Sequence, residues 1–227
     1  GFGVGINNHF GRFTDPNTDG NYHPSGVSIN NISAQDEQMS FSVHFSPVLL
    51  VRDYQMTALG NNRFSLNVTV ENITGLSASE IVLDIATDAG NVTFETDLAP
   101  LGEIAPNATV TTTTPFVFQT TDDVSSFAKF NVTSSGMGFQ GKTIEIEVPV
   151  NPGRVLLVDD DNTKGAAGEL EQYWIQGLNP IGIDYQVWET WEKDLPWSGL
   201  LNVYDLVIWA DGAATRSVPK PGAALDL

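Results

Sequence analysis

The sequence contains no cysteine, which excludes disulfide bridges, thiolate zinc sites and cysteine nucleophiles. Basic residues are also scarce, since Lys and Arg total 10 against 28 Asp and Glu, and the net charge is −18. An acidic surface repels phosphate backbones, so we expect no nucleic-acid partner. No apolar run approaches the roughly 20 residues that a membrane helix needs, so we expect no membrane span.

Histidine is limited to His9, His23 and His44. No His-Glu-x-x-His pattern places two imidazoles and a general base on one helical face, and no Gly-x-Ser-x-Gly elbow presents a serine nucleophile. We therefore expect the three histidines to be surface residues. We assign no catalytic, cofactor-binding or metal-binding residue to this chain.

The middle of the sequence alternates between apolar and polar residues with period two, which is typical of half-buried strands. Phe64, Leu66, Val68 and Val70 share one predicted face, and turn residues separate most strands. Residues 46–150 are therefore predicted to form an antiparallel immunoglobulin-like β-sandwich, which makes the chain mostly β. Its predicted strands are Val48–Thr57, Phe64–Glu71, Ser79–Thr87, Val92–Glu95, Pro115–Gln119, Ala128–Thr133 and Lys142–Val148.

Two shorter alternating runs precede this region. The runs Val27–Ile32 and Met39–Phe45 predict a hairpin at the end of an antiparallel sheet. In the second run every other residue is apolar, so its strand is expected to be half-buried.

The pattern changes after Asn151-Pro152-Gly153, where Val155–Val158 is continuously apolar, as in a strand covered on both faces. Helical spacing follows over Gly165–Leu178, and strands are predicted at Asp184–Trp188 and Tyr204–Trp209. Residues 151–227 are thus predicted to be a partial flavodoxin-like α/β domain with a parallel sheet. We expect Trp174, Trp188 and Trp209 to pack in its core, which leaves Trp191 and Trp197 as candidates for the surface.

Acidic residues follow two of these predicted strands. Asp159, Asp160 and Asp161 follow the first and Asp211 the third, so they are expected near the carboxyl edge, where open α/β sheets bind ligands. One interpretation is a Mg²⁺ or phosphoacceptor site. The run Val155–Asp161 resembles the first strand of response-regulator receivers, but the expected acceptor position holds Ala210. The other interpretation is acidic loop and helix-capping residues.

Asp15, Asn17, Asp19 and Gly20 match the start of a calcium loop. The twelfth position, which needs a carboxylate, is Gly26, so an Asx-type turn is the alternative. Six Asn-x-Ser/Thr sequons are interpreted as a consequence of composition, because Asn, Ser and Thr are frequent on strand faces; they begin at Asn31, Asn67, Asn72, Asn91, Asn107 and Asn131.

The segments Thr14–Asn17, Pro24–Ser33 and Met39–Val43 resemble the closing strands of immune-inhibitor-A-like secreted metallopeptidase domains. Residues 63–150 resemble the Ig-like modules that follow such domains, and Arg154–Asp161 with Tyr204–Trp209 resembles their appended flavodoxin-like modules. The resemblance implies that residues 1–45 are the C-terminal strands of a preceding peptidase-like domain, whose zinc ligands would lie upstream.

The resemblance implies a non-catalytic accessory region of a secreted or cell-surface bacterial or archaeal metallopeptidase. Its partners would be neighbouring domains of the same polypeptide and a protein or cell-surface substrate. Zinc is expected in the parent protein, and Ca²⁺ or Mg²⁺ are the ions to consider in this chain. The alternatives are an enzyme or phosphoacceptor that uses Asp159, Asp160 and Asp211, and an adhesin or carbohydrate-binding module.

Overall fold

The computed structural model describes residues 26–33, 38–121, 124–137, 139–160, 171–193 and 195–210. Strands dominate these residues, as the sequence predicts. The strands are β1 Val27–Asn30, β2 Ser42–Phe45, β3 Leu49–Gly60, β4 Arg63–Asn72, β5 Ala78–Thr87, β6 Val92–Thr96, β7 Leu98–Ile104, β8 Thr109–Thr111, β9 Phe116–Thr120, β10 Ser126–Gly136, β11 Phe139–Val150, β12 Val155–Asp159, β13 Tyr185–Glu189 and β14 Leu206–Ala210. The helices are α1 Glu171–Leu178, the 3-10 turn η1 Asn179–Ile181, α2 Thr190–Lys193 and α3 Ser198–Leu201.

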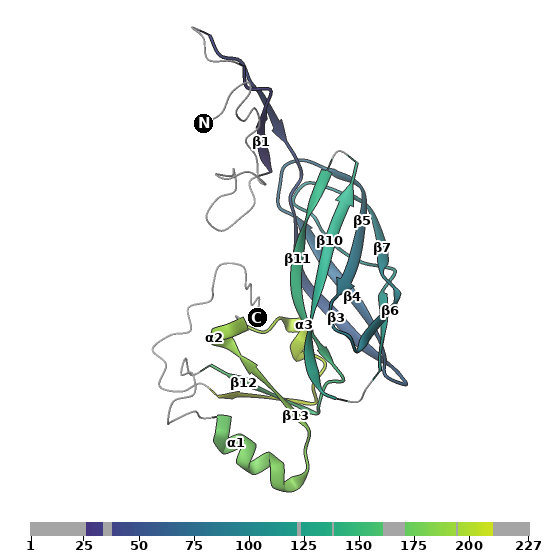
Figure 1. Ribbon diagram of the computed structural model, residues 1–227, viewed down its shortest axis with the longest axis vertical. Coiled ribbons are helices and arrows are strands. Elements are labelled where there is room, and N and C mark those ends of the chain that lie inside the picture. The colour runs from purple at the N-terminus through teal and green to yellow at the C-terminus, as the bar shows by residue number, and fades with distance from the viewer. Residues whose placement is uncertain are drawn as a thin grey trace.

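Two antiparallel sheets form the middle of the molecule and face each other (Figure 1). One has the strand order β11-β10-β5-β7 and the other the order β3-β4-β9-β6, with β8 also paired to β4. The prediction of antiparallel sheets in this region is confirmed.

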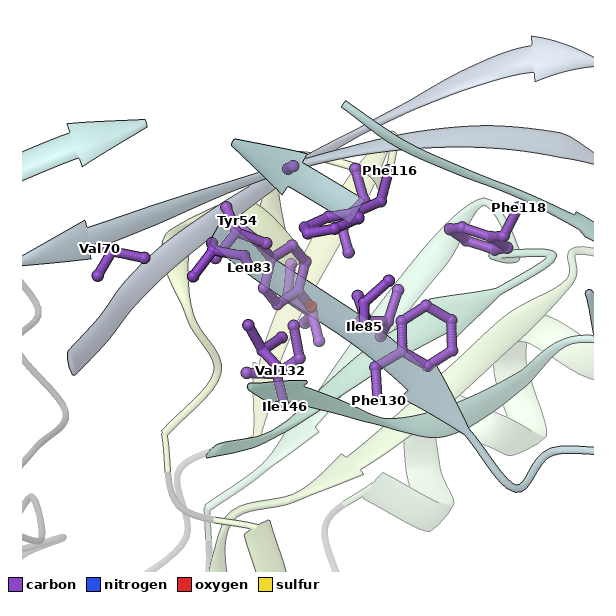
Figure 2. Close-up of a cluster of buried hydrophobic side chains, with 14 of the residues drawn as sticks. Tyr54, Val70, Leu83, Ile85, Phe116, Phe118, Phe130, Val132 and Ile146 are labelled. Atoms are coloured by element: carbon purple, nitrogen blue, oxygen red, sulfur yellow. The ribbon is translucent and has the colours of Figure 1, made fainter. Parts of the chain in front are cut away.

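The core between these sheets is built by alternating side chains. On β4, Phe64, Leu66, Val68 and Val70 are all at most 6% exposed, so the face predicted to be buried is confirmed. The ring of Phe118 lies 5.3 Å from that of Phe64 and 5.2 Å from that of Phe130, centroid to centroid. Phe118 and Phe130 belong to different sheets, so this contact joins the two layers (Figure 2).

Two strands were not predicted from the sequence. Strand β7 contains Pro100 and Gly102, which favour turns, and Gly102 has a φ of 73°. Because β7 lies at the edge of its sheet, Pro100 needs no ladder hydrogen bond on the open side. Strand β8 has only three residues.

The turn after β4 is organised by Asn72, which is fully buried. Its side-chain nitrogen lies 2.6 Å from the carbonyl oxygen of Leu76 and 3.3 Å from those of Ile104 and Ala105. Its side-chain oxygen accepts hydrogen bonds from the amide and hydroxyl of Thr74. Asn72 therefore satisfies backbone groups from two separate turns, and its side chain is inaccessible to solvent in the folded state.

Strands β1 and β2 form the predicted antiparallel hairpin, which projects from one end of the paired sheets (Figure 1). The hairpin is attached through Gly26, whose carbonyl oxygen accepts a 2.7 Å hydrogen bond from the amide of Ser46. Gly26 has a φ of 65°, and a Cβ there would lie 2.4 Å from the carbonyl oxygen of Ser46. Glycine is thus required at this junction.

At the other end, β13, β12 and β14 form a parallel sheet in that order. The predicted parallel pairing is therefore confirmed. Every residue of β12 is buried, as its continuous apolar sequence predicts. Helix α1 lies on one side of this sheet, and α3 lies between the sheet and the antiparallel sheets (Figure 1).

The predicted environments of the tryptophans are only partly correct. Trp188 is buried, as expected, but Trp174 is 48% exposed and Trp209 is 37% exposed. Trp197, a predicted surface candidate, instead packs partly buried against the hydrophobic core. For Trp174 and Trp197 the reason is that the antiparallel sheets cover Trp197, which lies beside Tyr54, whereas the side of α1 that carries Trp174 stays open. The side chain of Trp191 lies outside the described residues.

Candidate functional site

Asp159 and Asp160 stand at the carboxyl end of the central parallel strand, and they are only 2% and 4% exposed. The Asp160 carboxylate accepts hydrogen bonds from the Thr190 hydroxyl at 2.8 Å and from the Trp209 indole nitrogen at 3.1 Å. Its backbone amide also donates to the carbonyl oxygen of Ala210. Asp160 therefore connects the ends of the three parallel strands.

The other predicted ligands do not join this pair in the part of the chain that the structure describes. Asp161 and Asp211 lie outside the described residues, as do Asp15, Asn17 and Asp19 of the candidate calcium loop. Across the described ranges, no group of three or more acidic or histidine side chains is arranged to hold a metal ion. The hydrogen bonds from Thr190 and Trp209 give the Asp160 carboxylate a structural role, because they hold the ends of neighbouring strands together.

His44 is exposed on the hairpin, which agrees with its predicted surface position, whereas His9 and His23 fall outside the described residues. Among the described helices, none is long and apolar enough to cross a membrane.

Side chains of the antiparallel sheets and of the parallel-sheet unit meet in an interface that begins at a bulge in β3. Pairing with β4 shifts register between Val51 and Asp53. Because side chains alternate along a strand, the extra residue, Arg52, changes the direction in which the following side chains point. As a result Tyr54 is buried and the Asp53 carboxylate reaches α3, where the Ser198 hydroxyl and the Gly199 amide donate hydrogen bonds to it.

Gly199 allows the backbone of α3 to lie directly against β3. A Cβ at this position would lie 1.3 Å from the carbonyl oxygen of Tyr54, which is a backbone atom that cannot rotate away. Next to this contact, the rings of Tyr54 and Trp197 lie 5.9 Å apart. The first contact region of the interface therefore combines a close backbone approach, two hydrogen bonds and an aromatic pair.

A second contact region surrounds Lys193, the last residue of α2. Its ammonium group lies 2.7 Å from a Glu147 carboxylate oxygen on β11, and both side chains are only 19% exposed. The same nitrogen lies 4.3 Å from the ring centre of Phe127 and 5.0 Å from that of Trp188. Lys193 thus contacts both parts of the molecule.

The third contact region is made by Gln186 and Trp188 on β13. The Gln186 amide donates a 2.8 Å hydrogen bond to the carbonyl oxygen of Ser126 on β10, and accepts one from the Tyr204 hydroxyl. Phe127 and Trp188 meet edge to face at 5.2 Å.

Two tyrosine hydroxyls in this interface are held in their neutral form. Burial raises the pKa of Tyr204, and burial together with nearby Tyr204, Asp53 and Glu147 raises the pKa of Tyr54 well above its usual value. The Tyr54 hydroxyl donates a 2.8 Å hydrogen bond to the carbonyl oxygen of Glu147. Both hydroxyls therefore act as donors at neutral pH.

Sequence reasoning missed this interface because its members lie far apart in the chain. Asp53 and Gly199 are separated by 146 positions. Neither Asp53 nor Lys193 belongs to a recognisable motif. The sequence gives only two indirect indications of the interface. One is a tryptophan directly before a Ser-Gly pair, and the other is an interruption, at Arg52, in the alternation of inward and outward side chains along its strand.

The hairpin presents a second surface of interest. Val27 pairs with Phe45 and Ile29 with Val43, so these four side chains share one face. Met39, Phe41, Val43 and Phe45 are 52%, 59%, 43% and 67% exposed. We expected one face of this strand to be buried, but within the described part of the chain its apolar side chains are exposed.

The sequence matches no protein-family model, and the search of curated proteins found no match either.

Proposed function

We propose that this chain is a non-catalytic accessory region of a secreted multidomain metallopeptidase, in which it spaces, stabilises or presents the catalytic domain. The observation that carries the proposal is the apolar face of the β1–β2 hairpin. The proposed partners are neighbouring domains of the same polypeptide, and the proposed location is the exterior or surface of a bacterial or archaeal cell.

The hairpin supports a role that depends on a neighbour. A two-stranded hairpin is marginally stable in water, and an apolar face of this kind gains stability when another protein surface covers it. The opposite face carries Ser28, Asn30, Ser42 and His44, so only one side is suited to a dry contact. This two-sided pattern is what the last strands of a preceding domain would show.

The strand orders support an immunoglobulin-like sandwich for residues 46–150. The letters A to G can be given, in chain order, to the strands β3, β4, β5, β6, β9, β10 and β11. The two sheets then have the orders A-B-E-D and G-F-C, which is the arrangement of constant-type immunoglobulin domains. Strand β7 is an addition at the edge beside β5, and β8 is a short addition that pairs with the end of β4 beyond β9. Such sandwiches are common as non-catalytic modules.

The parallel sheet supports a partial flavodoxin-like module for residues 151–227. In chain order, its strands are arranged 2-1-3, which is how the flavodoxin-like order 2-1-3-4-5 begins. The Mg²⁺ or phosphoacceptor alternative requires Asp159, Asp160 and Asp211 to act together. Because Asp160 is bonded to Thr190 and Trp209, the accessory role is the better supported one.

A peptidase assay tests the accessory role. The purified chain is expected to hydrolyse no casein with or without added Zn²⁺, because the proposed zinc ligands lie in another domain. The measurement is release of soluble peptides over hours at several protein concentrations. Casein turnover that a chelator abolishes would overturn the proposal. A His-Glu-x-x-His pattern upstream of Gly1 in the intact polypeptide would support the proposed parentage.

A second candidate, carbohydrate binding, is favoured by two neighbouring exposed aromatic residues on α1. Tyr173 is 71% exposed and Trp174 is 48% exposed, and such rings can stack on the apolar faces of sugars. If this role is correct, a glycan array gives a reproducible hit, and Trp174→Ala lowers its signal at least tenfold while Phe41→Ala does not. Binding that survives Trp174→Ala, or an array without hits, would remove this candidate.

A further inference from the structure

We infer that the antiparallel sheets and the parallel-sheet unit fold and move as a single rigid body, so that the parallel-sheet unit uses the antiparallel sheets as part of its own core. This inference goes beyond the accessory role and does not depend on it. It concerns the described parts of residues 46–150 and 151–210, two ranges that the sequence predicts to belong to separate domains.

The first step of the argument is the continuity of the core. Leu156, Val158 and Trp188 of the parallel sheet belong to the same hydrophobic cluster as Phe130 and Tyr54 of the antiparallel sheets. Leu200 and Tyr204 join the same cluster between them. Separation would therefore expose one whole face of the parallel sheet to water, which is unfavourable in proportion to the apolar area exposed.

The second step is the distribution of the specific contacts. Three regions join the parts: Gly199 with β3, Lys193 with β11, and β13 with Ser126 and Phe127 on β10. These contacts involve three different strands of the antiparallel sheets. A hinge needs an axis about which contacts can be kept while the parts rotate, and three separate contact regions leave no such axis.

The third step is the connection between the parts, which is short and bonded at both ends. The side-chain oxygen of Asn151 accepts a 2.9 Å hydrogen bond from the Thr120 hydroxyl. The backbone carbonyl oxygen of Asn151 accepts another from the Ser125 hydroxyl. Two residues later, a Cβ on Gly153 would lie 3.0 Å from the backbone of Asp184, and the amide of Arg154 donates to the carbonyl oxygen of Asp184. The connection therefore adds no free linker of the kind that separates independent domains.

Gly199→Ala in the full chain tests the inference, because the added methyl group meets a backbone oxygen and forces α3 away from β3. Tryptophan fluorescence reports on the parallel-sheet unit, since all five tryptophans lie at or after position 174, and far-UV circular dichroism reports mainly on the antiparallel sheets. In the unchanged chain the two signals are expected to lose native structure at the same temperature. In the variant, the fluorescence midpoint is expected to fall by at least 5 °C and to separate from the other signal.

Gly177→Ala is the matched control, because Gly177 lies in α1 and a Cβ added there would meet no atom within 4 Å. In this variant the two unfolding midpoints should stay together and near those of the unchanged chain. If Gly199→Ala does not fold, Asp53→Ala replaces it, because that change removes two hydrogen bonds to α3 without adding bulk. Two separate transitions in the unchanged chain would overturn the inference. So would coincident, unshifted midpoints in both interface variants.

A distance measurement provides an independent readout. Because the chain has no cysteine, spin labels can be attached at E103C and Q176C without removing any natural thiol, and both positions are exposed. A single narrow distance distribution is expected in the otherwise unchanged chain, and a broadened one after Asp53→Ala. A broad or bimodal distribution without the interface change would contradict the rigid body.

Discussion

Replacing Phe118 with alanine is expected to lower the free energy of unfolding by about 3–5 kcal/mol, because it removes a fully buried ring and leaves a cavity between the two sheets. The Phe118 ring contacts Phe64, Phe94 and Phe130, so the cavity would affect both layers of the core. The measurement is equilibrium unfolding in urea, followed by circular dichroism.

Phe41→Ala is the matched control for this prediction. Phe41 is 59% exposed, so the same chemical change should alter the free energy of unfolding by no more than about 0.5 kcal/mol in the isolated chain. An equal decrease in the free energy of unfolding in Phe118→Ala and Phe41→Ala would show that the core does not lie between the antiparallel sheets.

Replacing Asn72 with alanine is expected to lower the free energy of unfolding by about 2–4 kcal/mol, although Asn72 is polar and lies at the end of a strand. The change leaves the carbonyl oxygens of Leu76, Ile104 and Ala105 and the amide of Thr74 without the bonds that the asparagine supplies. Buried backbone groups without partners are costly because they cannot be hydrated.

Asn131→Ala is the comparison, because Asn131 occupies the same Asn-x-Thr pattern but is half-buried on β10. Asn131→Ala is expected to lower the free energy of unfolding by less than about 1 kcal/mol. In a glycosylating host, mass spectrometry of the folded protein should also find Asn72 unmodified. Modification of Asn72, or a loss no larger than that of Asn131→Ala, would contradict the structural role.

The features that could be predicted from the sequence are those that local patterns determine. The alternation of Phe64, Leu66, Val68 and Val70 determines a buried face, and the continuous run at Val155–Val158 determines a strand covered on both sides. Pairing at the ends of the chain was also predictable, because the hairpin and the parallel crossovers involve elements that are close in sequence.

The features that could not be predicted depend on tertiary context. Pro100 and Gly102 are acceptable in β7 only because that strand lies at an edge, and sequence spacing does not reveal edges. Trp174 and Trp197 exchanged their expected environments because the parallel sheet buries its face against another part of the chain. Asp159 and Asp160 lie at the carboxyl end of β12 as expected, but the hydrogen bonds of Asp160 with Thr190 and Trp209 follow from the fold alone.

Strand β7 also bears on how readily one molecule can pair with another, because it is an edge strand. An edge strand with open hydrogen-bonding groups can pair with the edge of another molecule, and this pairing leads to fibrils. In β7, Pro100 removes a donor, Glu103 adds charge, and register shifts beside Ile81 distort the ladder. Together with the net charge of −18 on the whole chain, these features disfavour the formation of sheets between molecules.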